Sequence, residues 1–166
     1  MSAPFYSTSE RQASFLAEAR SWLGTPFAEN VAVKGSHGGV SCVHYIVAVQ
    51  VACGAWPTLT LPAQPVEVVR AWHEHHSVSK ILDFMARPEI RARLRKVDED
   101  DRPLIGDIAV MQIDHSTHHL ALYGGHELFH VTTRTGVIST SSRRGDAAAK
   151  IRSFYRIVGE PNAQPS

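Results

Sequence analysis

The stretch GSHGGVSCVHYIVAVQVAC, residues 35–53, decides the fold, because a glycine-rich loop turns here into a long apolar run. From position 42 to 53 the run is apolar on nearly every side, and its length favours a central buried helix over a strand. Cys42 opens this helix, and Ser41 precedes it as a candidate cap. Because N–H groups at a helix start favour thiolate over thiol, the sequence predicts that Cys42 is a reactive nucleophile.

The second cysteine, Cys53, stands at the far end of the same run. On one helix the two thiols would lie roughly 16 Å apart, at about 1.5 Å per residue. A disulfide needs Cα atoms about 5.5 Å apart, so we expect both thiols to be free. Cys53 is predicted to be a small buried hydrophobe.

Helices are expected to come first along the chain. Residues 7–23 have apolar positions at helical spacing, a capping-box pattern at Ser7 and Glu10, and stop signals at Gly24 and Pro26. Residues 54–64 form a proline-rich connection, and 66–97 are predicted to be helical in two or three pieces, broken near Ser77 and at Pro88. A charged helix end and loop is expected over 91–102.

From residue 106 onwards the pattern changes to short apolar segments typical of strands. They cover residues 106–113, 118–123, 126–131, 136–140 and 151–158. Helices followed by an antiparallel sheet indicate the α+β class. We expect one domain over 1–158 and a loose tail over 159–166.

Composition limits the possible partners and location. The chain has 166 residues, 43% of them hydrophobic, with 17 basic against 16 acidic side chains. No basic stripe is interleaved with aromatic residues, so nucleic acid is not an expected partner. No apolar stretch approaches the ~18 residues of a membrane-spanning helix, and the first residues lack the features of a signal peptide. We therefore expect the chain to be cytoplasmic as synthesised.

Histidines on a predicted hairpin can supply the base that a thiol nucleophile needs. If Gly124 and Gly125 form a two-residue turn, His119 lies directly across from His130 on one face, with Cβ atoms about 4.5–5.5 Å apart. On this register His119 is the base and His130 orients its ring. A zinc site at His115, His118 and His119 is a weaker alternative, because the cluster lacks a clean ligand spacing. We expect no metal and no cofactor.

Five segments together resemble the NlpC-type cysteine peptidases, the papain-like family that cleaves peptide stems of bacterial cell walls. They are ARSWLGTPF (19–27), VKGSHGGVSC (33–42), GDIAV (106–110), HLALY (119–123) and LFHV (128–131), in the family's order. The likeness is greatest to the phage-associated branch. It implies the nucleophile at Cys42, the base at His119 and a third polar residue at His130, the assignments that the hairpin register also gives.

Two positions depart from the family pattern. Ser41 stands where the family usually has Asp, and Phe27 stands where it usually has a tyrosine whose hydroxyl is thought to bind the developing oxyanion. The Cys42 backbone N–H remains as a donor, and Tyr45 or Tyr6 are candidate substitutes. Loss of one oxyanion donor can cost ~100-fold or more in rate.

The leading hypothesis is a thiol hydrolase that cleaves an amide bond through Cys42, His119 and His130. The resemblance implies a peptidoglycan substrate, cut in the stem peptide next to D-glutamate. A partner or larger assembly, such as a phage tail, is expected to supply targeting to the cell wall. The alternatives are a thiol acyltransferase or esterase of the same fold, and a non-catalytic structural or binding domain.

Overall fold

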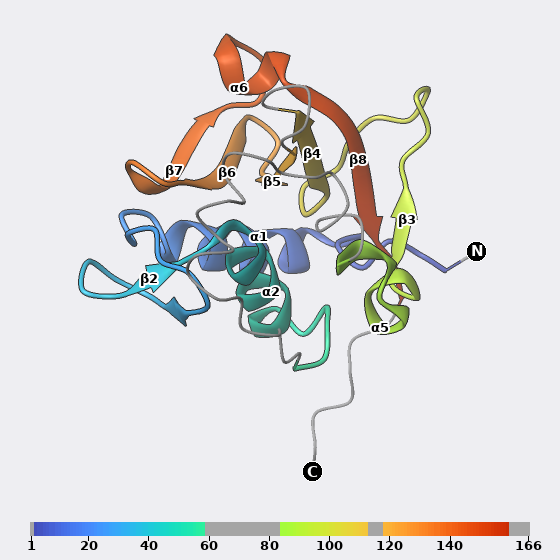
Figure 1. The fold of residues 1–166 in the computed structure, drawn as a ribbon. Coiled ribbons are helices and arrows are strands. Elements are labelled where there is room, and N and C mark those ends of the chain that lie inside the picture. The colour runs from blue at the N-terminus through green and yellow to red at the C-terminus, as the bar shows by residue number, and fades with distance from the viewer. Residues whose placement is uncertain (1, 59–83, 113–117, 160–166) are drawn as a thin grey trace.

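A six-stranded antiparallel sheet forms the centre of the computed structural model, which describes residues 2–58, 84–112 and 118–159. The strand order is β3-β8-β4-β5-β6-β7 (Figure 1). The strands are β3 (Leu94–Lys96), β4 (Ile108–Gln112), β5 (His118–Tyr123), β6 (Glu127–Thr132), β7 (Gly136–Ser141) and β8 (Ile151–Ile157). A separate pair joins β1 (Ala32–Val33) to β2 (Gly39–Val40).

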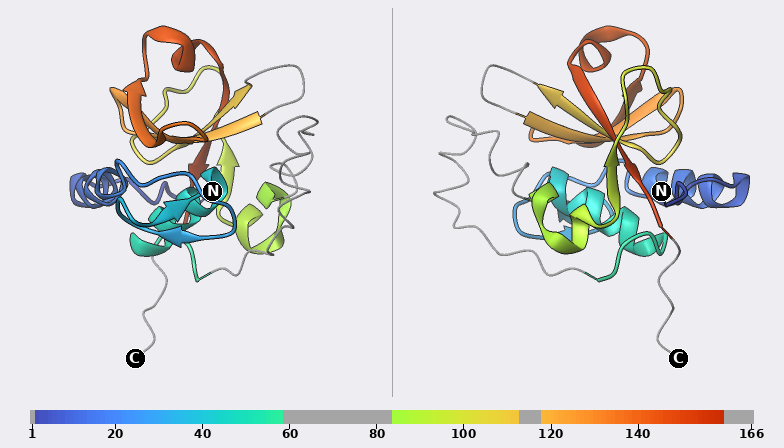
Figure 2. Two further views of the ribbon diagram at one scale, coloured as in Figure 1. Left: turned by 60° about the vertical axis from the view of Figure 1, so that its left-hand side comes forward. Right: turned by 90° about the vertical axis from the view of Figure 1, so that its right-hand side faces the viewer.

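Helices cover both faces of the sheet. They are α1 (Ser9–Ser21), α2 (Cys42–Ala52), α5 (Pro88–Arg91) and α6 (Gly145–Ala149). Helices α1 and α2 lie on one side of the strands and α6 on the other, as the views in Figures 1 and 2 agree. The predicted α+β class, with the candidate nucleophile at a helix start packed on an antiparallel sheet, is confirmed.

The main hydrophobic core fills the space between α1, α2 and the sheet. Its fully buried side chains include Phe15 and Ile46 from the helices and Leu120, Leu122 and Phe129 from the strands. Helix α2 is apolar nearly all round, and it packs against β5 and β6. The buried helix predicted from position 42 onwards is therefore present, and it supplies the inner wall of the core.

The start of α1 differs from the prediction. Thr8, not Ser7, is the N-cap: its backbone is extended and its hydroxyl accepts the backbone N–H of Arg11 at 3.2 Å. The preceding segment is fixed elsewhere, since the Phe5 N–H donates to the Ile157 carbonyl on β8. The helix cap therefore lies one residue later than predicted.

Only part of the predicted helical region 66–97 can be compared, because residues 59–83 and the break near Ser77 lie outside the described residues. Pro88 occupies the first turn of α5, a position where its missing N–H costs nothing. Residues 94–96, predicted to be helical, instead form strand β3 along the edge of β8, so that prediction was wrong. The open edge of β8 offers this segment a ladder of backbone hydrogen bonds.

The turn between β5 and β6 is two residues longer than predicted. Leu122 pairs with Phe129, Tyr123 pairs with Leu128, and the Gly124 N–H donates to the Glu127 carbonyl. The predicted register, with His119 directly opposite His130, was wrong. A shift of two residues keeps each side chain on its face, whereas a shift of one would have reversed it.

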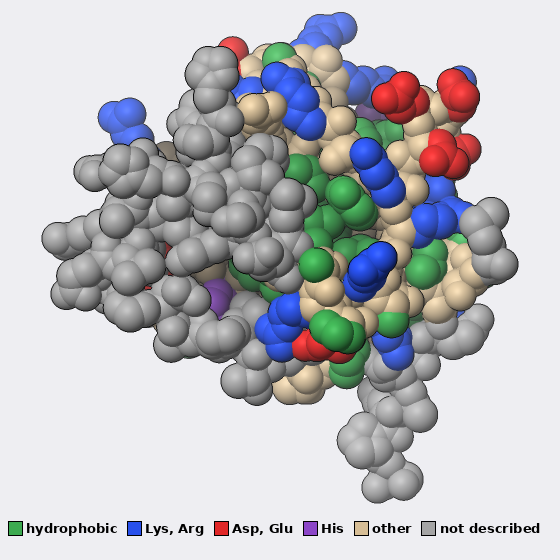
Figure 3. All heavy atoms as spheres, turned by 45° about the vertical axis from the view of Figure 1, so that its right-hand side comes forward, with side chains coloured by type: hydrophobic (Ala, Val, Ile, Leu, Met, Phe, Trp, Pro, Cys, Tyr) green, Lys and Arg blue, Asp and Glu red, His purple; other side chains and the backbone are tan. Residues whose placement is uncertain are grey.

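Charges of both signs share the molecular surface. On the face shown in Figure 3, basic and acidic side chains of the described residues lie around an apolar area, with neither sign forming a continuous stripe there. No helix among the described residues is long and apolar enough to span a membrane.

A buried ion pair holds the start of β4 to β8. Arg156 donates to both carboxylate oxygens of Asp107, at 3.1 and 2.9 Å, and its second nitrogen also reaches the Arg102 carbonyl. The carboxylate accepts a third bond from the Leu104 N–H at 2.8 Å. Both charged side chains are more than nine-tenths buried, so neither can be hydrated if its partner is lost.

Removing the Asp107 charge should therefore destabilise the fold. We expect Asp107→Asn, which can still accept the Leu104 N–H, to lower the free energy of unfolding by about 3 kcal/mol, because Arg156 remains buried without a counterion. Urea denaturation measures the loss. In the Asp107→Asn/Arg156→Met double variant the second substitution should cost much less than Arg156→Met alone, and additive costs would show that the pair is not coupled.

Candidate active site

Two glycines before Cys42 are closely packed against neighbouring residues, with no room for a side chain. A β-carbon on Gly38 would lie 1.8 Å from the Val33 carbonyl oxygen, and one on Gly39 would lie 2.4 Å from the Ala28 side chain. Neither distance is sterically possible, so the glycine-rich stretch is required for close packing. It delivers strand β2 directly into Ser41 and the start of α2.

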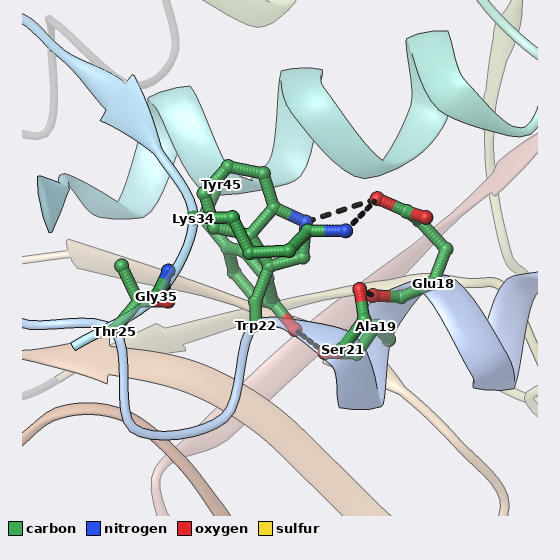
Figure 4. Close-up of polar contacts among 8 residues, drawn as sticks. All are labelled: Glu18, Ala19, Ser21, Trp22, Thr25, Lys34, Gly35 and Tyr45. Carbon is green, nitrogen blue, oxygen red and sulfur yellow. Dashed lines mark hydrogen bonds and ion pairs between the residues drawn. The ribbon is translucent and has the colours of Figure 1, made fainter. Parts of the chain in front are cut away.

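Helix α1 holds both the β1–β2 segment and α2 in place (Figure 4). The Glu18 carboxylate accepts the Trp22 ring N–H at 3.0 Å and the Lys34 ammonium at 3.1 Å through the same oxygen. The Tyr45 hydroxyl donates to the Ala19 carbonyl at 2.9 Å. These contacts tie together the segments 19–27 and 33–42 that carry the family resemblance.

The hydroxyl groups of the two tyrosines considered as oxyanion donors hydrogen-bond to other residues of the protein. Tyr45 is fully buried and its hydroxyl is bonded to Ala19, as above. Tyr6 is also buried, and its hydroxyl donates to the Gln50 side-chain oxygen at 2.5 Å. Each of these hydroxyl donors is already used in a hydrogen bond within the protein.

Ser41 and Phe27, the two positions that depart from the family pattern and remain candidates for binding substrate, lie near the start of α2. Ser41 caps the helix: its hydroxyl accepts the His44 N–H at 3.4 Å and lies 2.7 Å from His44 Nδ1. Phe27 is half-buried against the main core, and its backbone bridges to Val40 just before the cap. The Cys42 N–H, at the first position of the helix, has no intrahelical acceptor.

The candidate site lies where β5 and β6 separate. Tyr123 directs both of its backbone groups toward the β4 side, so by alternation Leu120 directs its own toward β6. The paired register of β5 and β6 covers only Leu122–Phe129 and Tyr123–Leu128. The Leu120 N–H instead hydrogen-bonds to the Cys42 sulfur. The nucleophile therefore meets β5 at the residue that follows His119.

His119 and His130 are joined by a hydrogen bond across the opened strands. His119 Nε2 lies 3.3 Å from His130 Nδ1, with the ring centroids 5.4 Å apart. In the observed register they are diagonal neighbours rather than an opposite pair, a spacing that long or aromatic side chains can bridge. Since Nε2 of His119 is used in this bond, only its Nδ1 is available to take a proton from a thiol.

Burial determines the charge state of the site. It raises the pKa of Cys42 to about 11, and the Glu29 carboxylate adds to the increase, while the N–H groups of Val43, Leu120 and Cys42 oppose it. Burial, with a smaller contribution from His130, lowers the pKa of His119 to about 3. Desolvation therefore opposes the thiolate that the N–H groups at the helix start favour. Taken separately, burial favours the neutral form of each group at neutral pH.

Metal ligands are not assembled in the part of the chain that the structure describes. No group of three or more His, Cys, Asp or Glu side chains there could hold a metal ion. His115, one of the histidines considered as zinc ligands, lies outside the described residues. The chemistry available at the described site is that of a thiol, two imidazoles and backbone N–H groups.

Solved structures that resemble this chain include NlpC/P60 proteins. An NLP/P60 family protein from Staphylococcus aureus, described as similar to a lipoprotein, superposes with a TM-score of 0.57 and 14% identity over 95% of this chain and 44% of its own. An NlpC/P60 family protein from Bacillus cereus gives 0.56 and 16%, over 89% and 40%. RipB, a peptidoglycan hydrolase from Mycobacterium tuberculosis, gives 0.51 and 14%, over 90% and 66%.

The chain therefore has the NlpC/P60 fold, and the predicted resemblance is confirmed at the level of fold. It spans less than half the length of the Staphylococcus and Bacillus proteins. No protein-family model and no curated protein sequence matches the chain.

The raised pKa of Cys42 predicts how the thiol reacts with iodoacetamide. In a Cys53→Ser variant, which isolates Cys42, the alkylation rate should rise about tenfold per pH unit from about pH 7 to about 10, because only the thiolate reacts. Stopped alkylation followed by intact-mass analysis gives the rates, and circular dichroism confirms folding at each pH. A plateau reached below about pH 8 would show instead that His119 already holds the proton of Cys42.

Proposed function

We propose that this protein is a cysteine hydrolase that cleaves an amide bond in the stem peptides of peptidoglycan. The observation that supports this most directly is the meeting of the Cys42 sulfur with β5 beside His119, whose ring is in turn bonded to His130. The NlpC/P60 fold adds support, since RipB is a peptidoglycan hydrolase with that fold. Peptidoglycan and its D-glutamyl stem peptides are the proposed substrate class.

The proposed reaction begins with attack of the Cys42 sulfur on the carbonyl carbon of the amide. As the carbon–sulfur bond forms, the thiol proton passes to Nδ1 of His119, and the carbonyl oxygen becomes an oxyanion near the Cys42 N–H at the helix start. Collapse breaks the carbon–nitrogen bond, and His119 returns the proton to the departing amine. Water, deprotonated by His119, then releases the carboxylic acid and regenerates the thiol.

The pKa values favour proton transfer during the attack rather than before it. With the pKa of Cys42 near 11 and that of His119 near 3, a thiolate–imidazolium pair in the free protein is unfavourable. The negative charge therefore passes from sulfur to the substrate oxygen as it forms, where backbone N–H groups can stabilise it. General-base catalysis of this kind needs the two groups to be closely aligned.

A second candidate function is a non-catalytic domain of the same fold that binds cell-wall peptides. Two observations favour it. Phe27 lacks the hydroxyl that the family's tyrosine has at this position, and the hydroxyls of Tyr45 and Tyr6 hydrogen-bond to other residues. Binding without turnover needs no oxyanion donor. Assays for both binding and cleavage of the same fragments separate the two functions.

Digestion of purified peptidoglycan tests the proposed function. The wild-type protein should release stem-peptide fragments that mass spectrometry detects, and Cys42→Ala should release none, because the nucleophile is gone. Cys53→Ser is the matched control and should retain the activity. A parallel panel of acyl esters detects an esterase, and release of fragments by Cys42→Ala at the wild-type rate would overturn the assignment of the nucleophile.

Restoring the hydroxyl at position 27 should increase turnover. We expect Phe27→Tyr to raise kcat on stem peptides by up to about 100-fold, the scale of one oxyanion donor, provided that the new hydroxyl reaches the tetrahedral oxygen. Phe27→Leu is the control, since it changes packing without adding a donor. If kcat of Phe27→Tyr stays within about twofold of the wild type, the oxyanion site is already complete without a hydroxyl there.

A further inference from the structure

The ring of His130 is held by a hydrogen-bond partner on each side. Its Nδ1 lies 3.3 Å from His119 Nε2 on β5, and its Nε2 lies 3.1 Å from the Thr140 hydroxyl on β7. In the β6–β7 register His130 pairs with Ile138, so Thr140 is its diagonal neighbour on the same face. His119, His130 and Thr140 therefore form one chain of side chains across three adjacent strands.

This chain has a direction, because a neutral imidazole has one N–H donor and one bare nitrogen acceptor. Burial lowers the pKa of both His119 and His130, so both rings are neutral at neutral pH. For His119 Nδ1 to accept the thiol proton, its own proton must be on Nε2 and must point to His130 Nδ1. The proton of His130 is then on Nε2 and points to Thr140.

The opposite direction would inactivate the base. If Thr140 donated to His130 Nε2, His130 would carry its proton on Nδ1 and donate it to His119 Nε2. His119 would then be protonated on Nδ1 and could not accept a proton from Cys42. Thr140 is half-exposed, so its hydroxyl proton can point to solvent while its lone pairs face His130.

We propose that Thr140 is a positioning residue whose hydroxyl oxygen accepts the Nε2–H of His130 and thereby holds His119 in the tautomer that can act as a base. The inference rests on the proposed thiol hydrolase and extends it to a fourth side chain. Thr140 touches neither substrate nor the thiol in this scheme. It acts only through His130, and the property it controls is the position of a proton.

The ring nitrogens of His130 report that proton directly. We expect 15N NMR of the wild-type protein, with the His130 signals assigned by their loss in His130→Gln, to show Nε2 protonated and Nδ1 bare. Thr140→Ser, which keeps the hydroxyl, should give the same tautomer. Thr140→Val, which removes the hydroxyl at nearly constant volume, should shift His130 toward the Nδ1-protonated form.

Turnover of stem peptides gives the second measurement. Thr140→Val should lower kcat about three- to tenfold with little change in KM, because one neutral hydrogen bond that biases the proton position is lost, and Thr140→Ser should match the wild type. Circular dichroism and thermal unfolding show whether the variants are folded. If Thr140→Val does not fold, the wild-type and Thr140→Ser tautomers still decide the proposal.

An Nδ1-protonated His130 in the wild type would overturn the inference, as would an unchanged tautomer and kcat in a folded Thr140→Val variant. These outcomes are separate from the test of the proposed function. A wild-type protein with Nε2-protonated His130 that cleaves no stem peptide would count against hydrolysis, while supporting the assigned direction of the hydrogen-bond chain.

Discussion

The hydrogen bond from the Leu120 N–H to the Cys42 sulfur is the contact on which the candidate site depends. It forms because β5 and β6 separate beyond Leu122, leaving a backbone donor of β5 without its strand partner. The start of α2 supplies the acceptor. A backbone N–H that a continuous ladder would have used thus lies at the thiol, at the residue next to His119.

Desolvation of Cys42 and His119 shifts the pKa values of both groups away from those needed for an ion pair. Desolvation raises the pKa of the Cys42 thiol and lowers that of His119, and it outweighs the N–H groups at the helix start. Burial therefore disfavours a thiolate in the free protein. Close alignment of the thiol and the imidazole is then required, and the hydrogen bond between His119 and His130 orients the imidazole.

The sequence predicts the parts of this fold that local patterns control. The apolar run and Ser41 predict α2 and its cap, and period-two segments between glycines predict β4 to β8. The β5–β6 register depends on turn geometry, which two glycines do not determine, so the prediction was two residues off. Because the error was even, His119 and His130 stayed on one face and their contact survived.

Other features depend on contacts between distant segments and leave no local signal. Strand β3 forms along an edge that β8 provides, and Asp107 finds Arg156 only when β4 and β8 pair. Thr140 reaches His130 only in the observed β6–β7 register. Threonine is common in strands, so its presence in the sequence does not indicate this contact. Predicting such residues requires the strand order and every register between them.

The serine before the nucleophile is understandable in these terms. Glu29 already raises the pKa of Cys42, and an aspartate at position 41 would bring a second carboxylate next to the Cys42 sulfur. Ser41 satisfies the His44 N–H as a cap without adding negative charge. A neutral cap therefore limits the penalty for forming charge on the sulfur during attack, in a site where burial already opposes that charge.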